Sequence, residues 1–154
     1  MTASDADTFD IGGFLSAAVP MVGTLALEYV ETTPERAVLK FRDRPEYRNH
    51  VGGPHAGAMF TLAESASGAV VVAAFGHLTA EATPLPTTAT IDFKKVARGD
   101  ITATATLGRP IPDILAELQS GKRPEFPIHV AIQRDNDDAV TGEMTIIWTL
   151  RPNN

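Results

Sequence analysis

Stretches in which apolar and polar residues alternate lie on both sides of one long apolar run. Alternation with a period of two is typical of strands that bury one face, and an apolar run of about twenty residues is typical of an enclosed helix. The run at residues 56–75 therefore predicts a long helix that other elements must cover on nearly every side. The alternating stretches predict six strands, at residues 24–30, 37–41, 88–94, 101–107, 128–134 and 140–150.

Turn-forming residues separate these predicted elements. Residues 31–35 and 98–100 predict turns between successive strands, and residues 83–86, which read Thr-Pro-Leu-Pro, predict a loop. An apolar run at residues 9–19, which Pro20 ends, predicts a short helix or a docking arm. The strands and the long helix are thus expected to be joined by short connections.

One further segment interrupts the four later strands. Residues 111–121 have Asp113 near a helix start and Gly121 as a helix stop, which predicts a short inserted helix. A chain of 154 residues, 44% of them hydrophobic, has the size of one unit with its own core. Residues 1–154 are therefore predicted to form a single domain, with residues 1–23 as an N-terminal arm or helix.

This order of elements predicts an α+β fold, in which one antiparallel sheet of about six strands wraps around the long central helix. Such a sheet covers one side of its helix poorly, so a second copy of the chain is predicted to complete the cover. We therefore expect a homodimer, and a homotetramer built as a dimer of dimers is an open alternative.

Charge and composition exclude several classes of function. The net charge of −6 opposes binding to nucleic acid, which requires a basic face. The chain has no cysteine, which excludes disulfides and thiolate chemistry, and its four histidines are too scattered to ligate a metal. No cofactor or metal is therefore expected. The first ten residues include three aspartates and no Lys or Arg, unlike a secretory signal, which predicts a cytoplasmic protein.

The apolar run is also long enough to cross a bilayer. Glu64, Ser65 and Ser67 lie in its middle, however, and a carboxylate at the centre of a bilayer is costly. Its flanks lack the aromatic and basic residues that anchor membrane helices. A buried helix is therefore expected in place of a membrane span.

Two motifs resemble those of the hotdog superfamily, in particular the phenylacetate-pathway type of acyl-CoA thioesterase and a neighbouring hotdog family of undefined function. The first motif is Asn49-x-x-Gly52-x-x-His55-Ala56-Gly57, followed by Phe60-x-Leu62-Ala63-Glu64. The second, at residues 91–100, is similar to the central strand and Gly-Asp turn of the family. The resemblance covers about residues 25–150. It implies a hotdog fold and the hydrolysis of an acyl-CoA thioester to a free acid and CoA.

The chain departs from the family's pattern in three places. Ala56 stands where the first Gly of a pair is usual, and it still supplies the backbone N–H that the family uses. Glu64 stands where the closest members have Asp. The insertion at residues 111–121 is not typical of the thioesterase branch and points toward the undefined family. A module that binds acyl-CoA without turnover is therefore the first alternative function.

The chemistry of thioester hydrolysis can be assigned to a few residues. It needs hydrogen-bond donors for the carbonyl oxygen and a base or nucleophile near the carbonyl carbon. Unpaired N–H groups of Ala56 and Gly57 at the helix start would be the donors, and Glu64, its pKa raised by burial, would be the base or nucleophile. Ala56 and Glu64 lie about 12 Å apart along one helix, at ~1.5 Å per residue. One helix start and the carboxylate of a partner subunit are therefore expected to share a site, as the resemblance also implies.

The remaining candidate residues surround this expected site. The resemblance implies that Asn49 positions water or the substrate carbonyl, and Gly52 belongs to the same signature. His55 either faces the ligand or only begins the helix. The resemblance implies a water-holding hydroxyl near Thr87 and Thr88. Lys94, Lys95 and Arg98 either contact the phosphates of CoA at a subunit boundary or are solvated strand-end residues.

A dehydratase or hydratase acting on acyl thioesters is the second alternative, because His50 and Glu64 have a spacing similar to that of hotdog dehydratases. Those enzymes open the helix with a Pro-Gly pair where this chain has Ala58-Met59. The Asp-x-Asn-Pro-x-His signature of the hydratases is also absent. Thioester hydrolysis is therefore the favoured interpretation.

Overall fold

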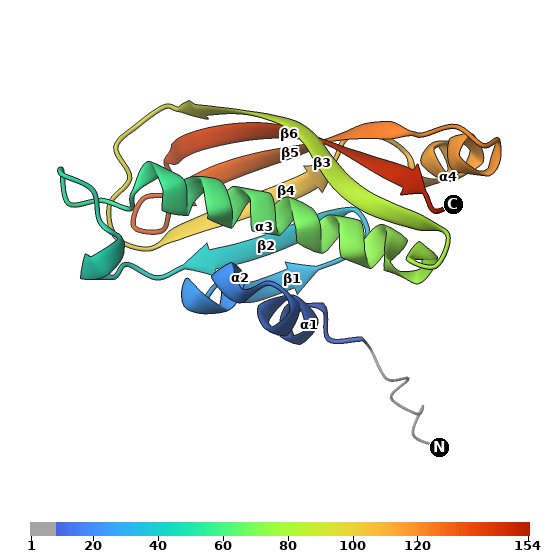
Figure 1. The fold of residues 1–154 in the computed structure, drawn as a ribbon. Helices are drawn as coiled ribbons and strands as arrows, with labels where there is room; N and C mark the ends of the chain where they lie inside the picture. Colours follow the sequence, from blue (N-terminus) through green and yellow to red (C-terminus); the bar gives the residue numbers. More distant parts are fainter. Residues whose placement is uncertain (1–8) are drawn as a thin grey trace, which may run out of the picture.

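The computed structural model describes residues 9–154, whose elements are arranged as Figure 1 shows. Two short helices and a hairpin precede the long helix, and four strands with one inserted helix follow it. The elements are α1 (Ile11–Ala18), α2 (Pro20–Thr24), β1 (Glu28–Thr32), β2 (Arg36–Phe41), η1 (Pro45–Tyr47), α3 (Ala56–Phe75), η2 (Gly76–Leu78), β3 (Ala82–Phe93), β4 (Ile101–Leu107), α4 (Ile111–Gln119), β5 (Glu125–Arg134) and β6 (Val140–Pro152).

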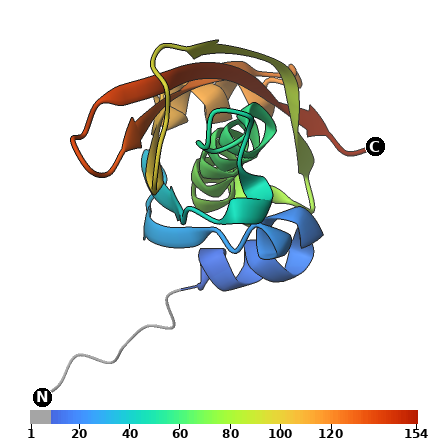
Figure 2. The ribbon, with the colours of Figure 1, turned by 90° about the vertical axis from the view of Figure 1, so that its left-hand side faces the viewer.

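The six strands form one antiparallel sheet in the order β1-β2-β4-β5-β6-β3. The sheet curls around α3, and α1 and α2 lie below that helix, as the end-on view in Figure 2 shows. This arrangement confirms the predicted α+β fold and the long central helix. The two sheet edges are β1 and β3, and β3 is the longer of them.

Helix α3 forms the centre of the core. Leu62, Ala63, Ala66 and Ala69 are fully buried against the sheet. The segment Ala56–Leu78 is long and apolar enough to cross a membrane, but 67% of its most apolar window is buried inside the protein. This burial agrees with the expectation of an enclosed helix. A continuous apolar run was thus needed because the sheet surrounds most of the helix.

One polar contact ties α3 to the sheet. The Ser67 hydroxyl donates to the carbonyl oxygen of Glu64 at 2.6 Å and accepts the indole N–H of Trp148 at 3.0 Å. Both side chains are buried, and Ser67 supplies the hydrogen bond that the indole N–H of Trp148 would otherwise lack. This bond holds the middle of α3, where Glu64 lies, at a fixed place on β6.

The loop predicted at residues 83–86 is wrong, because β3 begins at Ala82 and includes both prolines. Pro84 lies opposite Leu150 and Pro86 opposite Trp148, with a bulge before Thr88. Proline is tolerated here because β3 is an edge strand, and its missing N–H can face away from β6. The first half of β3 consequently cannot pair with a further strand at its free edge. The six residues that follow the bulge can.

The N-terminal region also differs from the prediction. Pro20 ends α1 as expected, but it then begins α2, where its fixed φ suits the first helical position. The predicted strand at residues 24–30 is therefore shortened, and β1 begins only at Glu28. Of the predicted N-terminal arm, residues 1–8 lie outside the described residues.

The inserted helix is present as α4, and Gly121 follows it at φ +83°, a conformation that favours glycine. Ile114 of α4 is fully buried, and Arg109 pairs with Glu117 beside it. Figure 1 shows α4 at the end of the molecule opposite to the start of α3. The insertion therefore extends the core at the far end and does not reach the helix start.

Candidate active site

A cavity of about 440 Å³ lies at the start of α3. Three segments that are far apart in the sequence meet there: the loop before α3, the first turn of α3 and the end of β3 with the loop that follows. The cavity is lined by Asn49, Val51, Pro54, Ala56, Met59, Phe93, Lys94, Lys95, Val96 and Ala97. The structure thus brings Asn49, Ala56, Lys94 and Lys95, four of the predicted site residues, around one space.

The loop before α3 is held in shape by Asn49. Its Oδ1 accepts the N–H groups of Val51 at 3.0 Å and Gly53 at 3.1 Å, and its Nδ2 donates to the Pro54 carbonyl at 3.3 Å. A Cβ at Gly53 would lie 1.9 Å from the carbonyl oxygen of Ala97, so only glycine allows this close approach. In this structure Asn49 shapes the loop, and its predicted contact with water or substrate stays a prediction.

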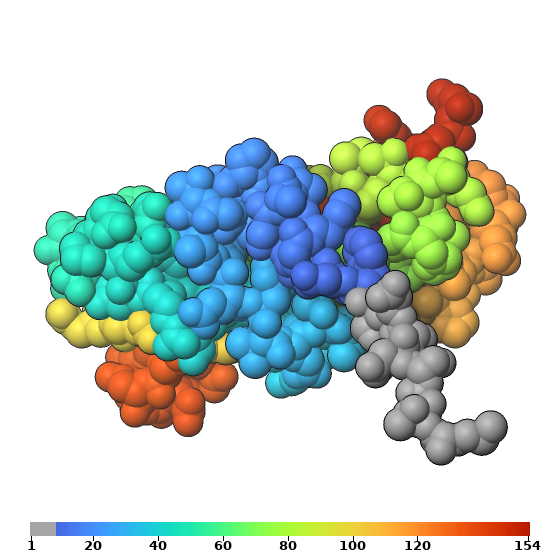
Figure 3. Space-filling view, turned by 90° about the horizontal axis from the view of Figure 1, so that it is seen from below, coloured from blue at the N-terminus to red at the C-terminus, as the bar shows by residue number. Residues whose placement is uncertain are grey.

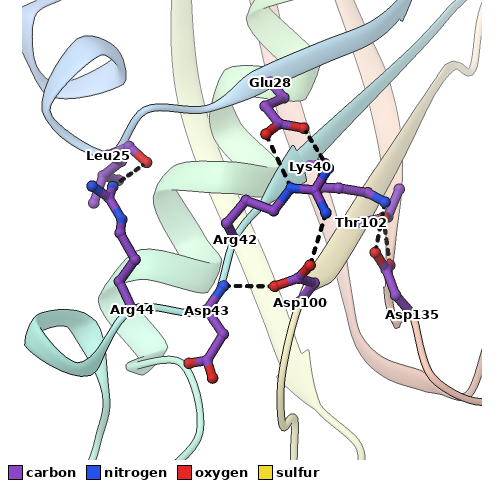
Figure 4. Close-up of polar contacts among 9 residues, drawn as sticks. All are labelled: Leu25, Glu28, Lys40, Arg42, Asp43, Arg44, Asp100, Thr102 and Asp135. Atoms are coloured by element: carbon purple, nitrogen blue, oxygen red, sulfur yellow. Dashed lines mark hydrogen bonds and ion pairs between the residues drawn. The ribbon is translucent and has the colours of Figure 1, made fainter.

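A network of ion pairs fixes the same loop to the sheet (Figure 4). Arg42 donates to both carboxylate oxygens of Glu28 and, at 2.9 Å, to Asp100. Asp100 also accepts the backbone N–H of Asp43 at 2.8 Å. This N–H and then Arg42 hold the pKa of Asp100 below its ordinary value. The Gly-Asp turn of the second motif therefore anchors the chain that leads to α3.

The first turn of α3 carries the predicted backbone donors. The expectation of an unpaired Gly57 amide is wrong for this structure, because Gly57 N–H donates to His55 Nδ1 at 2.9 Å. Sequence reasoning missed that an imidazole one residue before the helix can accept this proton as a helix cap. Met59 N–H bonds to the His55 carbonyl, and within the described residues the N–H groups of Ala56 and Ala58 have no acceptor. Ala58 is buried, whereas Ala56 is exposed and lines the cavity, so Ala56 is the accessible free donor of the turn.

Glu64 lies two turns further along α3 and faces a second cavity, of about 230 Å³. The residues around it are mostly apolar: Leu15, Val19, Val22, Tyr29, Ser65, Gly68, Val71, Val72, Pro84 and Trp148. Burial raises the pKa of Glu64 above its ordinary value, as expected for a carboxylate taken out of water. The helix start and Glu64 therefore open into two separate spaces of one subunit.

Tyr29 is a member of the Glu64 cavity that sequence reasoning missed. Its hydroxyl is buried and has no hydrogen-bond partner in the described part of the chain. Burial, and then the charge of Glu64, raise the pKa of Tyr29 to about 12. Only the folding of β1 against α3 places these two residues together, and the alternation of β1 carries no sign of it.

Replacing Tyr29 with Phe is expected to raise the free energy of unfolding by about 1 kcal/mol, because it removes a buried hydroxyl that lacks a partner and keeps the ring. Urea denaturation measures this. Tyr47→Phe is the matched control, since Tyr47 donates to the Thr24 carbonyl at 3.1 Å and should lose stability. A loss of stability in both variants would contradict the prediction.

The other predicted binding residues are exposed. Lys94 and Lys95 line the helix-start cavity, Lys94 is 3.4 Å from Glu143, and Arg98 lies beside Gly52, which has a φ of +78°. Thr87 donates to the Ile147 carbonyl at 3.2 Å at the bulge of β3. The structure places Thr87 and Thr88 on the β3 edge and outside both cavities.

Comparisons with known proteins agree with this architecture. A protein of unknown function from Pseudomonas aeruginosa, described as a probable thioesterase, is 25% identical, with 93% of this chain and 95% of that chain aligned at a TM-score of 0.82. The phenylacetic acid degradation protein PaaI from Thermus thermophilus shares the fold at 16% identity, over 86% of this chain and 98% of that chain, with a TM-score of 0.67.

The sequence comparisons give a family. No curated protein matches the sequence. Residues 11–150 match the domain of unknown function DUF4442. Since this match spans nearly all of the described chain and the solved relatives share its sheet and central helix, the chain belongs to the DUF4442 family and has the hotdog fold of the acyl-CoA thioesterase superfamily.

Proposed function

We propose that the protein is an acyl-CoA thioesterase whose active site forms between two subunits. The observation that carries the proposal is the position of Glu64. A carboxylate with a pKa raised by burial lies in a mostly apolar cavity, and an exposed helix start with a free amide lies at the other end of the same sheet edge. Neither cavity alone holds both the base and the donor.

Pairing of two β3 edges would bring these halves together. Pro84, near the start of β3, lines the Glu64 cavity, and Phe93, its last residue, lines the helix-start cavity. Because the first half of the strand is blocked by prolines, the pairing segment is the open part after Thr87. Two copies of β3 that pair antiparallel through this part place the Pro84 end of each beside the residues that follow Phe93 in the other, and those residues line the helix-start cavity.

Exposed apolar residues support a partner at this edge. Val51, Phe60, Phe93 and Val96 lie around the helix start or the end of β3, and Phe93 and Val96 are 52% and 53% exposed. A cluster of this kind beside an unpaired strand edge is typical of a surface that another chain covers. A homodimer is thus part of the proposed function, and a dimer of dimers remains a prediction.

In the proposed reaction, the thioester carbonyl lies between Ala56 of one subunit and Glu64 of the other. Glu64 removes a proton from water as the water oxygen attacks the carbonyl carbon, and Ala56 N–H stabilises the negative charge on the carbonyl oxygen. The C–S bond then breaks, and the sulfur leaves with the proton from Glu64. Direct attack by Glu64, with an anhydride that water then opens, is the alternative for the same residues.

The CoA part would lie outside the helix start. Lys94 and Lys95 line that cavity and Arg98 is close to it, which gives an acidic protein a local basic surface for phosphates. Gly57 N–H becomes a second donor if the His55 ring turns away when substrate binds. The inserted helix α4 lies at the far end of the molecule (Figure 1), so it gives no support to a module that binds without turnover.

The test is a panel of acyl-CoAs, from acetyl-CoA to hexadecanoyl-CoA and including phenylacetyl-CoA, assayed with a thiol-detecting reagent. We expect the wild-type protein to release CoA from at least one of them. Release from none would overturn the proposal. Thermal stabilisation by acyl-CoA without release would favour the binding module.

A further inference from the structure

A larger, mostly apolar cavity adjoins the Glu64 cavity. This larger cavity has a volume of about 630 Å³ and shares Val71, Val72 and Pro84 with the Glu64 cavity. Its other walls come from α1 and the residue two before it, from the end of β1 and the turn after it, and from the end of α3 with η2 and the residue after it. These residues are Phe9, Ile11, Phe14, Thr32, Pro34, Ala73, Gly76, His77 and Thr79. The two spaces thus follow α3 from Glu64 toward its C-terminal end.

The floor of this passage is one face of α3. Glu64, Gly68 and Val72 of α3, and Gly76 at its C-cap, are spaced four residues apart, so these positions lie in one inclined row along the helix. All four are partly exposed, whereas the rest of the helix from Leu62 onward is mostly buried. Gly68 and Gly76 have no side chains, so they leave the space above the helix free. Glu64 is the only acidic residue that lines either space, and the lining beyond it is mostly apolar, with Thr32, His77 and Thr79 as its polar members.

Helix α1 forms the outer wall of the passage. A Cβ at Gly12 would lie 2.9 Å from the Tyr29 ring, so α1 packs closely over Tyr29. Phe9 and Phe14 contact each other with ring centroids 5.5 Å apart and line the larger space. The view in Figure 3 shows α1 beside the segment that follows α3. The hydroxyl of Tyr29 is the only buried side-chain nitrogen or oxygen atom without a hydrogen-bond partner in the described residues, and it lies at the Glu64 end.

We propose that this passage binds the aliphatic acyl chain of the substrate, and that the substrate is a straight-chain acyl-CoA of about 8 to 14 carbons. The inference rests on the proposed thioesterase function and names its substrate class. An alkyl chain fits because the passage is apolar and long, and because its polar end is the proposed base. The chain would extend into the subunit that supplies Glu64, while CoA stays on the subunit that supplies the helix start.

The helix provides a scale for chain length. Val72 and Gly76 lie about 12 Å and 18 Å beyond Glu64, at ~1.5 Å per residue. An extended alkyl chain advances about 1.3 Å per carbon, given C–C bonds of about 1.5 Å, so these distances correspond to about 9 and 14 carbons. A bulky side chain at each position should therefore stop the acyl chain at a different length.

The experiment compares kcat/KM for butanoyl-, octanoyl-, dodecanoyl- and hexadecanoyl-CoA in three variants. Val72→Trp should lower the value for dodecanoyl-CoA by about 30-fold and that for butanoyl-CoA by less than about threefold, because buried methylenes carry the affinity. Gly76→Leu should affect only the longest chain. Gly76 has a φ of −59°, and a Cβ there meets only Val72 Cγ1 at 3.5 Å, so this variant should fold. Val30→Trp, at a residue 63% exposed, is the matched control.

Measuring acyl-CoA binding without turnover distinguishes the proposed passage from the proposed thioesterase activity. Calorimetric titration of the Glu64→Gln protein with butanoyl-, dodecanoyl- and hexadecanoyl-CoA reports the passage without turnover. Tighter binding of the longer chains supports the passage if Val72→Trp abolishes it for dodecanoyl-CoA or Gly76→Leu abolishes it for hexadecanoyl-CoA, even if wild type hydrolyses nothing and the thioesterase proposal falls. Equal binding and equal hydrolysis of all lengths, unchanged in Gly76→Leu, would overturn the passage and leave the thioesterase proposal intact. If Val72→Trp does not fold, the Gly76→Leu comparison decides alone.

Discussion

Glu64→Gln is expected to lower kcat for CoA release by about 10³-fold, within the 10²–10⁴ range that a positioned general base contributes. Glutamine has nearly the same shape and occupies the same space in the cavity, but it cannot accept a proton from water or attack a carbonyl. KM should change little, because the substrate contacts proposed at the helix start and along α3 remain. The measurement is steady-state CoA release with the best substrate of the panel.

Glu46→Gln is the control for this change. Glu46 lies in η1, is exposed and shows no side-chain hydrogen bond in the described chain, so its loss should leave kcat unchanged. If Glu64→Gln releases CoA as fast as Glu46→Gln, the carboxylate has no part in the reaction. A thioesterase on this fold would then need a different base.

The raised pKa of Glu64 sets the direction of two pH effects. The folded state binds the proton of this carboxyl more tightly than the unfolded chain, whose value is near 4.5. Its contribution to stability is therefore fully present below about pH 4.5 and is lost as the pH rises through the folded-state pKa. Wild type should be less stable than Glu64→Gln at neutral pH, and hydrolysis should fall as the pH drops below the folded-state pKa, since the base must be ionised.

The fold could be predicted from the sequence wherever one local pattern decided the structure. The apolar run of α3 and the alternation of β4, which spans Ile101–Leu107 as predicted, are patterns of this kind. Pro84 and Pro86 misled the prediction, because their acceptance in a strand depends on β3 being at an edge, which is a property of the whole sheet.

Part of the candidate site could also be predicted from the sequence. Glu64 stood out because it interrupts an apolar helix, and Ala56 because it follows a loop with glycine and proline. Tyr29 could not be found, since its place beside Glu64 results from the packing of β1 and α1 over α3. The hydrogen bond from Gly57 to His55 depends on a side-chain rotation that the sequence does not fix.

Ala56→Pro is the second change with a large expected effect, a fall in kcat of about 10²–10³-fold from the loss of one oxyanion donor. Proline is well suited to the first position of a helix, where it removes only the free N–H. His55 has φ −60° and ψ 144°, which is the conformation that a following proline requires. The helix should therefore form, and Ala56→Ser, which keeps the N–H, should stay close to wild type in both activity and melting temperature.

The two inactive variants together test whether the site is shared. Glu64→Gln and Ala56→Pro chains with different affinity tags can be co-expressed, and the mixed dimers isolated on both tags. Each mixed dimer pairs the intact helix start of one chain with the intact Glu64 of the other at one of its two sites, so about half of wild-type activity should return. If each subunit held a complete site of its own, neither chain would have both groups and the mixed dimers would stay inactive. Recovery would show that the 12 Å between helix start and carboxylate, at ~1.5 Å per residue, is bridged by a second subunit.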